Sequence, residues 1–467
     1  MELLTLQLDS DNKKPYYQQL YSYIKTEIQS GRIPYNTKLP SKRKLSSYLG
    51  ISQNTIQAAY DQLIEEGYII AIEKKGFFVC KIDFIQKIKV DTHNLTDVKA
   101  EESKLLYDFT YHGVDMPSFP FDQWRKLMKD VINEYDEELL MPGDSLGFYR
   151  LRSALSDYLH QSRGVNCTPQ QIVISSGTEM LFQTLIQLFD EESIYGIENP
   201  GYEKLNQLFN GNRASFTPIG IDQNGMLLEG ILKSNANILC IAPAHQFPSG
   251  GIMPINRRIQ LLNWANETDK CYIIEDDYDS EFKYSGKPIP ALQGLDTNEK
   301  VIYMGSLSKS ISPTLRVSYM VLPTHLMKQF KERLSYILCP VPIMEQKVLC
   351  QFIEQGYFER HLNKMRTIYK RKRDILVKAI TDLDCSIEIL GAEAGLHLLI
   401  KVPNTMCEKE LIHAALKQGV KTYGISKYYS DRTALRPDPI LLLGFATMHE
   451  KSIEEAVGLL KKAWFGE

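Results

Sequence analysis

The sequence predicts a multidomain chain in which a small α+β unit precedes a large α/β unit. Before residue 80, three helical patterns are followed by two short strand-like runs. Between residues 81 and 107 the chain is mostly polar, with weak periodicity. From residue 108 onward, short apolar strand-like runs alternate with helical ones. At a rough prior of ~150 residues per domain, 467 residues are enough for one small and one large unit.

The composition is that of an ordinary globular protein and excludes several classes. Hydrophobic residues make up 43% and the net charge is −3, which excludes a generally basic protein but leaves room for a local basic patch. No apolar run approaches the ~18 residues that cross a bilayer, and no signal peptide is evident. The eight cysteines are scattered and form no C-x-x-C pair, which favours reduced thiols. We expect a cytoplasmic protein that binds no metal and no membrane.

The small unit has the pattern of a winged helix-turn-helix. Apolar residues recur at helical spacing in 17–30, and Ser41 and Ser52 are candidate N-caps of two further helices that end at Gly50 and Gly67. Two short strand-like runs around a basic glycine turn follow, up to residue 79, and predict a β-hairpin. Three helices followed by such a hairpin define the winged fold.

A local basic patch lies in this unit. Residues 32–60 contain five basic residues and no acidic one. The third helix would present uncharged polar groups to base edges in the major groove, whereas the basic residues would neutralise phosphates. The predicted base-reading residues are Ser52, Gln53, Asn54 and Thr55, and the predicted phosphate contacts are Lys42, Arg43, Lys44 and the wing residue Lys75. The alternative is a solvated basic face without a ligand.

The run 38–45 (K-L-P-S-K-R-K-L) resembles the L-P-S-x-R-x-L signature of GntR-type bacterial regulators. The resemblance continues through Ser52–Ile56 and Leu63–Ile69 and covers about residues 14–80. It implies a domain that binds double-stranded promoter DNA. The division that we predict is a DNA-binding domain at 1–80, an exposed linker at 81–107 and an effector domain at 108–467.

The large unit has the pattern of a mainly parallel sheet. Short apolar, β-rich runs at 172–175, 238–242, 271–275 and 301–304 alternate with helical patterns. Ligands of such sheets bind where the parallel strands end. The residues that follow each run are therefore candidates for a ligand site.

Chemically suggestive residues follow the strand ends. Residues 175–180 (S-S-G-T-E-M) would place backbone N–H groups at a helix N-terminus, which suits an anion or a plain turn. Residues 198–202 (E-N-P-G-Y) put an aromatic after a rigid turn, where it could stack on a ring or simply pack. The acids of 275–279 would need a cationic partner, and a metal is the competing interpretation. Lys309, with Arg316 seven residues on, suits a nucleophilic lysine beside a phosphate clamp.

The order of these segments resembles the aspartate-aminotransferase (fold type I) arrangement for pyridoxal 5′-phosphate (PLP), over about residues 108–467. The resemblance implies that Lys309 forms the Schiff base, the internal aldimine, with PLP. Asp276 would pair with the pyridinium nitrogen, Tyr278 would hydrogen-bond the phenolic oxygen and Tyr202 would stack on the ring. The phosphate would be held by Gly177, Thr178, Ser306, Ser308 and Arg316. Phe247 replaces the asparagine that usually contacts the cofactor.

A GntR-like head on an aminotransferase-like body resembles the MocR regulators over nearly the whole chain. That resemblance implies a homodimer with crossed domains. It also implies two cations for an effector carboxylate, at positions that are Lys204 and Lys427 here, where relatives that respond to amino acids have arginines. Arg432 or Arg436 could take over that role.

The function that we expect is a transcription regulator that responds to PLP through Lys309, with PLP synthesis as a candidate target. The alternatives are a response to an amino acid such as GABA or D-alanine, an active aminotransferase with a DNA-binding head, and a regulator in which PLP only stabilises the fold. Sensing is favoured over catalysis because lysines replace the carboxylate-binding arginines.

Overall fold

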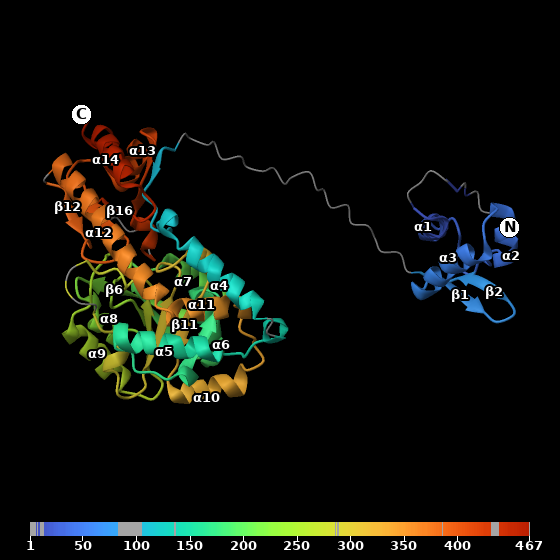
Figure 1. Cartoon of the computed structure of the whole chain (residues 1–467), viewed down its shortest axis with the longest axis horizontal. Helices are drawn as coiled ribbons and strands as arrows, with labels where there is room; N and C mark the ends of the chain where they lie inside the picture. The colour runs from blue at the N-terminus through green and yellow to red at the C-terminus, as the bar shows by residue number, and fades with distance from the viewer. Residues whose placement is uncertain are drawn as a thin grey trace. The chain divides into compact units, whose positions relative to one another are not determined.

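The computed structural model describes residues 6, 8–9, 14–82, 105–134, 137–284, 286, 289–384, 386–430 and 439–466. Most of the predicted linker, as well as Arg432 and Arg436, lies outside the described residues. The chain divides into two compact units, Met1–Ala100 and Glu101–Glu467, which are described separately below and drawn in Figure 1.

The small unit consists of three helices and one hairpin. The helices are α1 (Tyr16–Gln29), α2 (Lys42–Leu49) and α3 (Gln53–Glu65), and the antiparallel hairpin is β1 (Ile69–Ile72) with β2 (Gly76–Val79). Both predicted caps are present. Ser41 accepts a hydrogen bond from the backbone N–H of Lys44, and Ser52 accepts one from that of Thr55.

The core of the small unit comes from the periodic apolar residues of all its elements. Leu20, Ile24 and Ile28 of α1 are buried against Leu45 of α2 and Leu63 of α3. The amphipathic spacing in the sequence therefore builds the hydrophobic core of this unit. The wing turn includes Lys74, whose φ of 61° lies in the left-handed region.

An eight-stranded sheet forms the centre of the large unit. In spatial order its strands are β4 (Ile172–Ser175), β11 (Ser318–Val321), β10 (Val301–Ser306), β9 (Tyr272–Asp277), β8 (Ile238–Ile241), β5 (Ile194–Asn199), β6 (Ser215–Asp222) and β7 (Gly225–Met226). The pairs from β10 through β9, β8 and β5 to β6 are parallel, whereas β11 and β7 pair antiparallel with their neighbours. The sheet is mainly parallel, as predicted.

A second, antiparallel sheet lies nearer the C-terminus. Its order is β12 (Glu388–Leu390), β13 (His397–Lys401), β16 (Ile440–Gly444) and β15 (Tyr423–Gly424). A small parallel pair joins β3 (Tyr107–Asp108) to β14 (Val420–Lys421). These strands, with α13 and α14, lie at one end of the large unit in Figure 1.

Helices surround both sheets of the large unit (Figure 1). They are α4 (Phe121–Asn133), α5 (Tyr149–Arg163), α6 (Thr178–Leu188), α7 (Glu203–Gly211), α8 (Leu228–Lys233), α9 (Ile255–Ala265), α10 (Thr324–Arg333), α11 (Ile343–Glu354), α12 (Tyr357–Leu383), α13 (Glu408–Lys417) and α14 (Glu450–Phe465). The long α12 packs against both α11 and α14 and so connects the two sheet regions. Within the described ranges, none of the helices has the length and apolar character that a membrane span requires.

Candidate cofactor site and nucleic-acid interface

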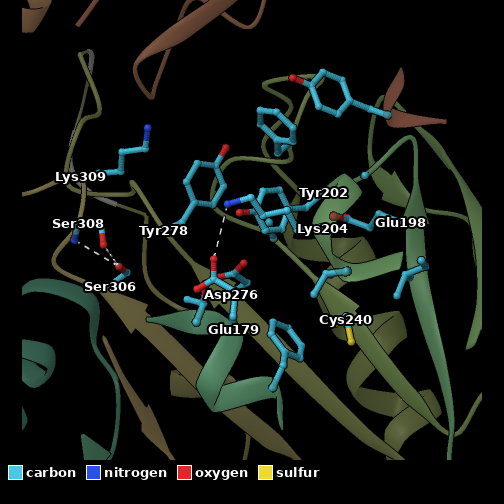
Figure 2. Close-up of a pocket in the computed structure, with 18 of the residues that line it drawn as sticks. Glu179, Glu198, Tyr202, Lys204, Cys240, Asp276, Tyr278, Ser306, Ser308 and Lys309 are labelled. Carbon is cyan, nitrogen blue, oxygen red and sulfur yellow. Dashed lines mark hydrogen bonds and ion pairs between the residues drawn. The ribbon is translucent and has the colours of Figure 1, made fainter. Parts of the chain in front are cut away.

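A cavity opens at the carboxyl ends of the parallel strands (Figure 2). Most of the predicted cofactor residues line it. They are Thr178, Tyr202, Asp276, Tyr278, Ser306, Ser308, Lys309 and Arg316. The parallel strands that are neighbours in space come from distant parts of the sequence. They all end at one edge of the sheet, and this brings loops from four parts of the chain together. Gly177 does not line the cavity but packs against the Arg316 guanidinium.

Lys309 follows β10 and projects its side chain along one side of the cavity (Figure 2). Its Nζ donates a hydrogen bond to the backbone oxygen of Tyr111. Burial lowers the pKa of the Lys309 amine to about 8, and Asp279 partly opposes the shift. Because a neutral amine is the nucleophilic form, this environment suits attack on an aldehyde near neutral pH.

Asp276, in β9, provides the strongest test of whether the site fits PLP. Its Oδ1 is buried and has no hydrogen-bond partner among the described residues. Burial, followed by repulsion from Asp277 and Asp279, raises the pKa of Asp276 to about 7. A protonated ring nitrogen would supply both the missing hydrogen bond and the missing positive charge. The donor set of the cavity therefore fits a pyridinium ring.

The proposed phosphate end combines a helix N-terminus with hydroxyl groups. Gly177 precedes the first residue of α6, with φ of 88°, and a Cβ there would lie 2.1 Å from the Arg316 guanidinium. The Ser306 hydroxyl accepts a hydrogen bond from the backbone N–H of Ser308 at 3.2 Å. Backbone N–H groups, hydroxyls and a guanidinium are the groups that bind phosphate dianions.

Glu179 is a cavity residue that the sequence analysis quoted but did not assign. Its Oε2 lies 2.8 Å from Nη2 of Arg316, and its Oε1 lies 3.6 Å from Nζ of Lys204. Burial raises the pKa of Glu179, but its own backbone N–H and Arg316 more than offset this, so the net shift is downward. A phosphate at Arg316 would compete with this carboxylate. An acid in the first turn of α6 was the available signal.

Glu198 is a second unassigned carboxyl group of the cavity. It is the penultimate residue of β5, shortly before the Pro-Gly-Tyr turn, and its Oε1 is buried without a partner among the described residues. Burial raises its pKa to about 8, so it is mostly neutral at neutral pH.

The structure places the two predicted effector lysines differently. Lys204 lines the cavity, whereas Lys427 is not among the lining residues. The Nζ of Lys427 lies over the rings of Tyr423 and Tyr428, at 5.1 and 4.8 Å from their centroids. Burial lowers the pKa of Lys427. Lys204 therefore lines the cavity directly, whereas the Lys427 amine lies against the ring of Tyr428, which lines the cavity.

The aromatic wall of the cavity is built around Phe247. Its ring packs edge-on against Tyr202 at 6.2 Å and against Tyr278 at 6.4 Å between centroids. Phe247 itself offers no hydrogen bond to a ligand.

The predicted DNA-reading residues occupy the start of α3. Ser52, Gln53 and Asn54 are exposed. Thr55 is half-buried, and its hydroxyl lies 2.8 Å from that of Ser52. Cap formation therefore engages these two hydroxyls, which leaves the Gln53 and Asn54 amides as the better-placed groups for base contacts.

The predicted phosphate contacts come from α2 and from the wing turn. Arg43 and Lys44 of α2 and Lys75 of the wing are exposed. Lys42 is half-buried and donates a hydrogen bond to Gln57.

Comparison with known proteins agrees with this two-part organisation. Residues 16–79 match the bacterial regulatory proteins of the gntR family, and residues 114–460 match aminotransferase class I and II. The class defined by fold and site is thus a GntR-type DNA-binding head joined to an aminotransferase-type body. The chain belongs to the MocR-type family of helix-turn-helix transcription regulators.

Its relatives cover nearly the whole chain. The uncharacterised HTH-type transcriptional regulator YdeL of Bacillus subtilis is 43% identical over 96% of this chain and 97% of its own length. The probable rhizopine catabolism regulatory protein MocR of Rhizobium meliloti is 30% identical over 98% and 96%. The pyridoxine biosynthesis transcriptional regulator PdxR of Corynebacterium glutamicum is 27% identical over 93% of both chains.

Among solved structures, Pyrococcus horikoshii kynurenine aminotransferase aligns with a TM-score of 0.69 and 26% identity, over 78% of this chain and 91% of that one. The predicted fold class of both units is confirmed. GntR regulators bind DNA, and aminotransferase-fold proteins depend on PLP and are typically dimers.

Proposed function

We propose that this PLP-dependent transcription regulator senses PLP itself, held through Lys309, and that PLP binding changes its affinity for promoter DNA. The single observation that carries the proposal is the arrangement of the Lys309 amine and the unpartnered Asp276 carboxylate in one cavity. PLP, when bound, supplies an aldehyde for a lysine and a ring that withdraws electrons.

Each of the predicted cofactor residues binds a different part of PLP in this proposal. Lys309 supplies the amine that joins the aldehyde, and Asp276 pairs with the ring nitrogen. Tyr278 holds the phenolic oxygen and Tyr202 covers one ring face. The proposed phosphate end consists of Gly177, Thr178, Ser306, Ser308 and Arg316. The domain division at 1–80, 81–107 and 108–467 and a domain-crossed homodimer belong to the same proposal.

Two arguments favour PLP as the signal. The relative PdxR is named for regulation of pyridoxine biosynthesis, so vitamin B6 synthesis is a candidate target here. In addition, Lys204 already has a carboxylate partner in Glu179, and this weakens the attraction of Lys204 for an effector carboxylate. With Lys427 directed to aromatic rings, the second predicted anchor for an amino acid is also weakened.

The test is the affinity of the full chain for DNA from upstream of its own gene, measured at fixed salt with and without PLP. Salt is held constant because phosphate contacts make the affinity depend steeply on it. Wild-type protein should change its affinity or footprint when PLP is added, and Lys309→Ala should not respond. Lys300→Ala is the matched control, because Lys300 is also buried but precedes β10, whereas Lys309 follows it.

The outcomes separate the candidate functions. A PLP response that survives Lys309→Ala would remove the proposed role of Lys309. PLP binding without any change in affinity or footprint would make PLP a structural group. An effect seen only with an added amino acid would favour the second candidate, an effector held at Lys204, which lines the cavity.

A further inference from the structure

A buried histidine–aspartate pair lies directly behind Tyr278. His245 comes from the segment after β8, and Asp279 follows β9. Their side chains are 1% and 2% exposed, and Nδ1 of His245 lies 3.0 Å from each Asp279 carboxylate oxygen. The same Nδ1 lies 2.9 Å from the Tyr278 hydroxyl.

The geometry constrains where the protons lie. An ionised carboxylate only accepts hydrogen bonds, so two carboxylate oxygens at 3.0 Å require a proton on Nδ1 of His245. The Tyr278 oxygen then also faces an N–H and accepts from it. The hydroxyl proton of Tyr278 is consequently not used by His245 and remains available to a ligand in the cavity.

The fold maintains this pair by close packing. Gly395 precedes β13, has φ of 72°, and lies so near the pair that a Cβ would be 2.0 Å from Cε1 of His245 and 2.7 Å from Oδ2 of Asp279. On the other side, Phe247 packs edge-on against the Tyr278 ring. Both the pair and the phenol are therefore held in one arrangement, with room for few alternative rotamers.

We infer that the His245–Asp279 pair is a positioning device that makes Tyr278 an obligate hydrogen-bond donor to the phenolic oxygen of the bound pyridoxal ring. The inference rests on the proposed function, since it requires PLP in this cavity. It gives the tyrosine added importance here, because Phe247 stands where a second side-chain donor is expected and cannot donate.

Other titratable groups also act on the pair and must be considered in any titration. Those coupled electrostatically to His245 or Asp279 in the described structure are Asp276, Tyr278, Glu281, Tyr284, Lys309 and His397. A titration of one variant is therefore ambiguous, whereas a double-mutant cycle through Tyr278 isolates the hydrogen bond.

The experiment is a pH titration of the visible absorption of PLP bound to the full-length protein. A hydrogen-bond donor to the phenolic oxygen stabilises the unprotonated form of the bound PLP. Tyr278→Phe should therefore raise the apparent pKa of the PLP absorption change by about one unit, as expected for the loss of one hydrogen bond to a charged acceptor. Asp279→Asn removes the carboxylate that holds a proton on Nδ1, so His245 can adopt the other tautomer, in which Nδ1 is an acceptor and competes for the Tyr278 proton. This variant should raise the apparent pKa in the same direction, by roughly half a unit or more.

The double-mutant cycle of Tyr278 and Asp279 tests whether the pair acts through Tyr278. In the Tyr278→Phe background, Asp279→Asn should add no further shift. His245→Phe, which keeps the ring packing but removes Nδ1, gives an independent reading if Asp279→Asn fails to fold. The matched control is His397→Phe, because His397 is equally buried and touches the His245 ring but hydrogen-bonds the Pro248 carbonyl.

Additive shifts in the double variant, no shift in either the Asp279 or the His245 variant, or an equal shift in the His397 control would each overturn the inference while leaving PLP binding intact. Wild-type protein that shows no visible band with PLP would overturn both the inference and the proposed function.

Discussion

Lys309→Met is predicted to stabilise the cofactor-free protein near pH 7. Burial holds the pKa of the Lys309 amine at about 8, below its ordinary 10.5. Between these two values the unfolded chain binds a proton that the folded chain does not, so stability rises with pH in that window. Conversely, below about pH 8 the folded state bears the full cost of a buried charge, which methionine removes.

The magnitude follows from the size of the shift. A drop from 10.5 to about 8 corresponds to roughly 3 kcal/mol at ~1.36 kcal/mol per pKa unit. Part of the side chain is accessible from the cavity, so this is an upper limit. Loss of the hydrogen bond from Lys309 to the Tyr111 backbone oxygen destabilises the variant by about 1 kcal/mol. The expected net gain is about 2 kcal/mol near pH 7, falling to nothing or reversing as the pH approaches 10.5.

The assay is urea denaturation of the cofactor-free full chain, followed by tryptophan fluorescence at several pH values. All three tryptophans, at positions 124, 264 and 464, lie in the large unit, so the signal reports on that unit. Lys300→Met is the control, because Lys300 donates to the Thr268 carbonyl and its loss should destabilise the protein. A Lys309→Met protein that is less stable than wild type at pH 7, or whose advantage does not change with pH, would refute the reasoning.

Four further variants have expected results. Glu179→Gln removes the carboxylate that competes with phosphate, a partly exposed pair worth about 0.2–1 kcal/mol, so PLP should bind about 1.5- to 5-fold more tightly in a fluorescence titration, and weaker binding would contradict this. Asn54→Ala should cost about 1–3 kcal/mol at one base pair of the operator, whereas Lys75→Ala should weaken all sequences alike and reduce the log–log salt slope by about 0.9. Asp277→Asn breaks the buried pair with Arg163 and should destabilise the large unit by about 3–5 kcal/mol in urea, and a change below 1 kcal/mol would argue against that pair.

Local patterns predicted the elements with good accuracy. The run at 172–175 is β4 to the residue, and the run at 301–304 lies within β10. The caps at Ser41 and Ser52 form as expected. These features depend on interactions within a few residues, such as side-chain alternation and cap hydrogen bonds, so the sequence alone carries the information.

The order of motifs along the chain also predicted which residues would gather at one site. Thr178, Tyr202, Asp276 and Lys309 each follow or end a strand, and parallel strands present those ends at a common edge. The roles of these residues in binding PLP remain predictions for the experiments above.

Other relationships depend on tertiary packing alone. Glu179 contacts Arg316 across 137 residues of sequence, and the Lys427 amine lies over the rings of Tyr423 and Tyr428. The contact of His245 with Asp279 depends on β8 and β9 being neighbours in the sheet and on Gly395 leaving space beside them.

By itself, therefore, the sequence predicted the two units, many of their elements and most of the groups that line the cavity, but not the roles of Glu179 and Glu198. Only the tertiary structure decided which of those groups touch, which carboxylates lack partners and which way a hydroxyl proton is free to point. The physical reason is that secondary structure reflects periodicity over short distances, whereas hydrogen bonds and pKa shifts depend on burial and on neighbours brought together by the strand order.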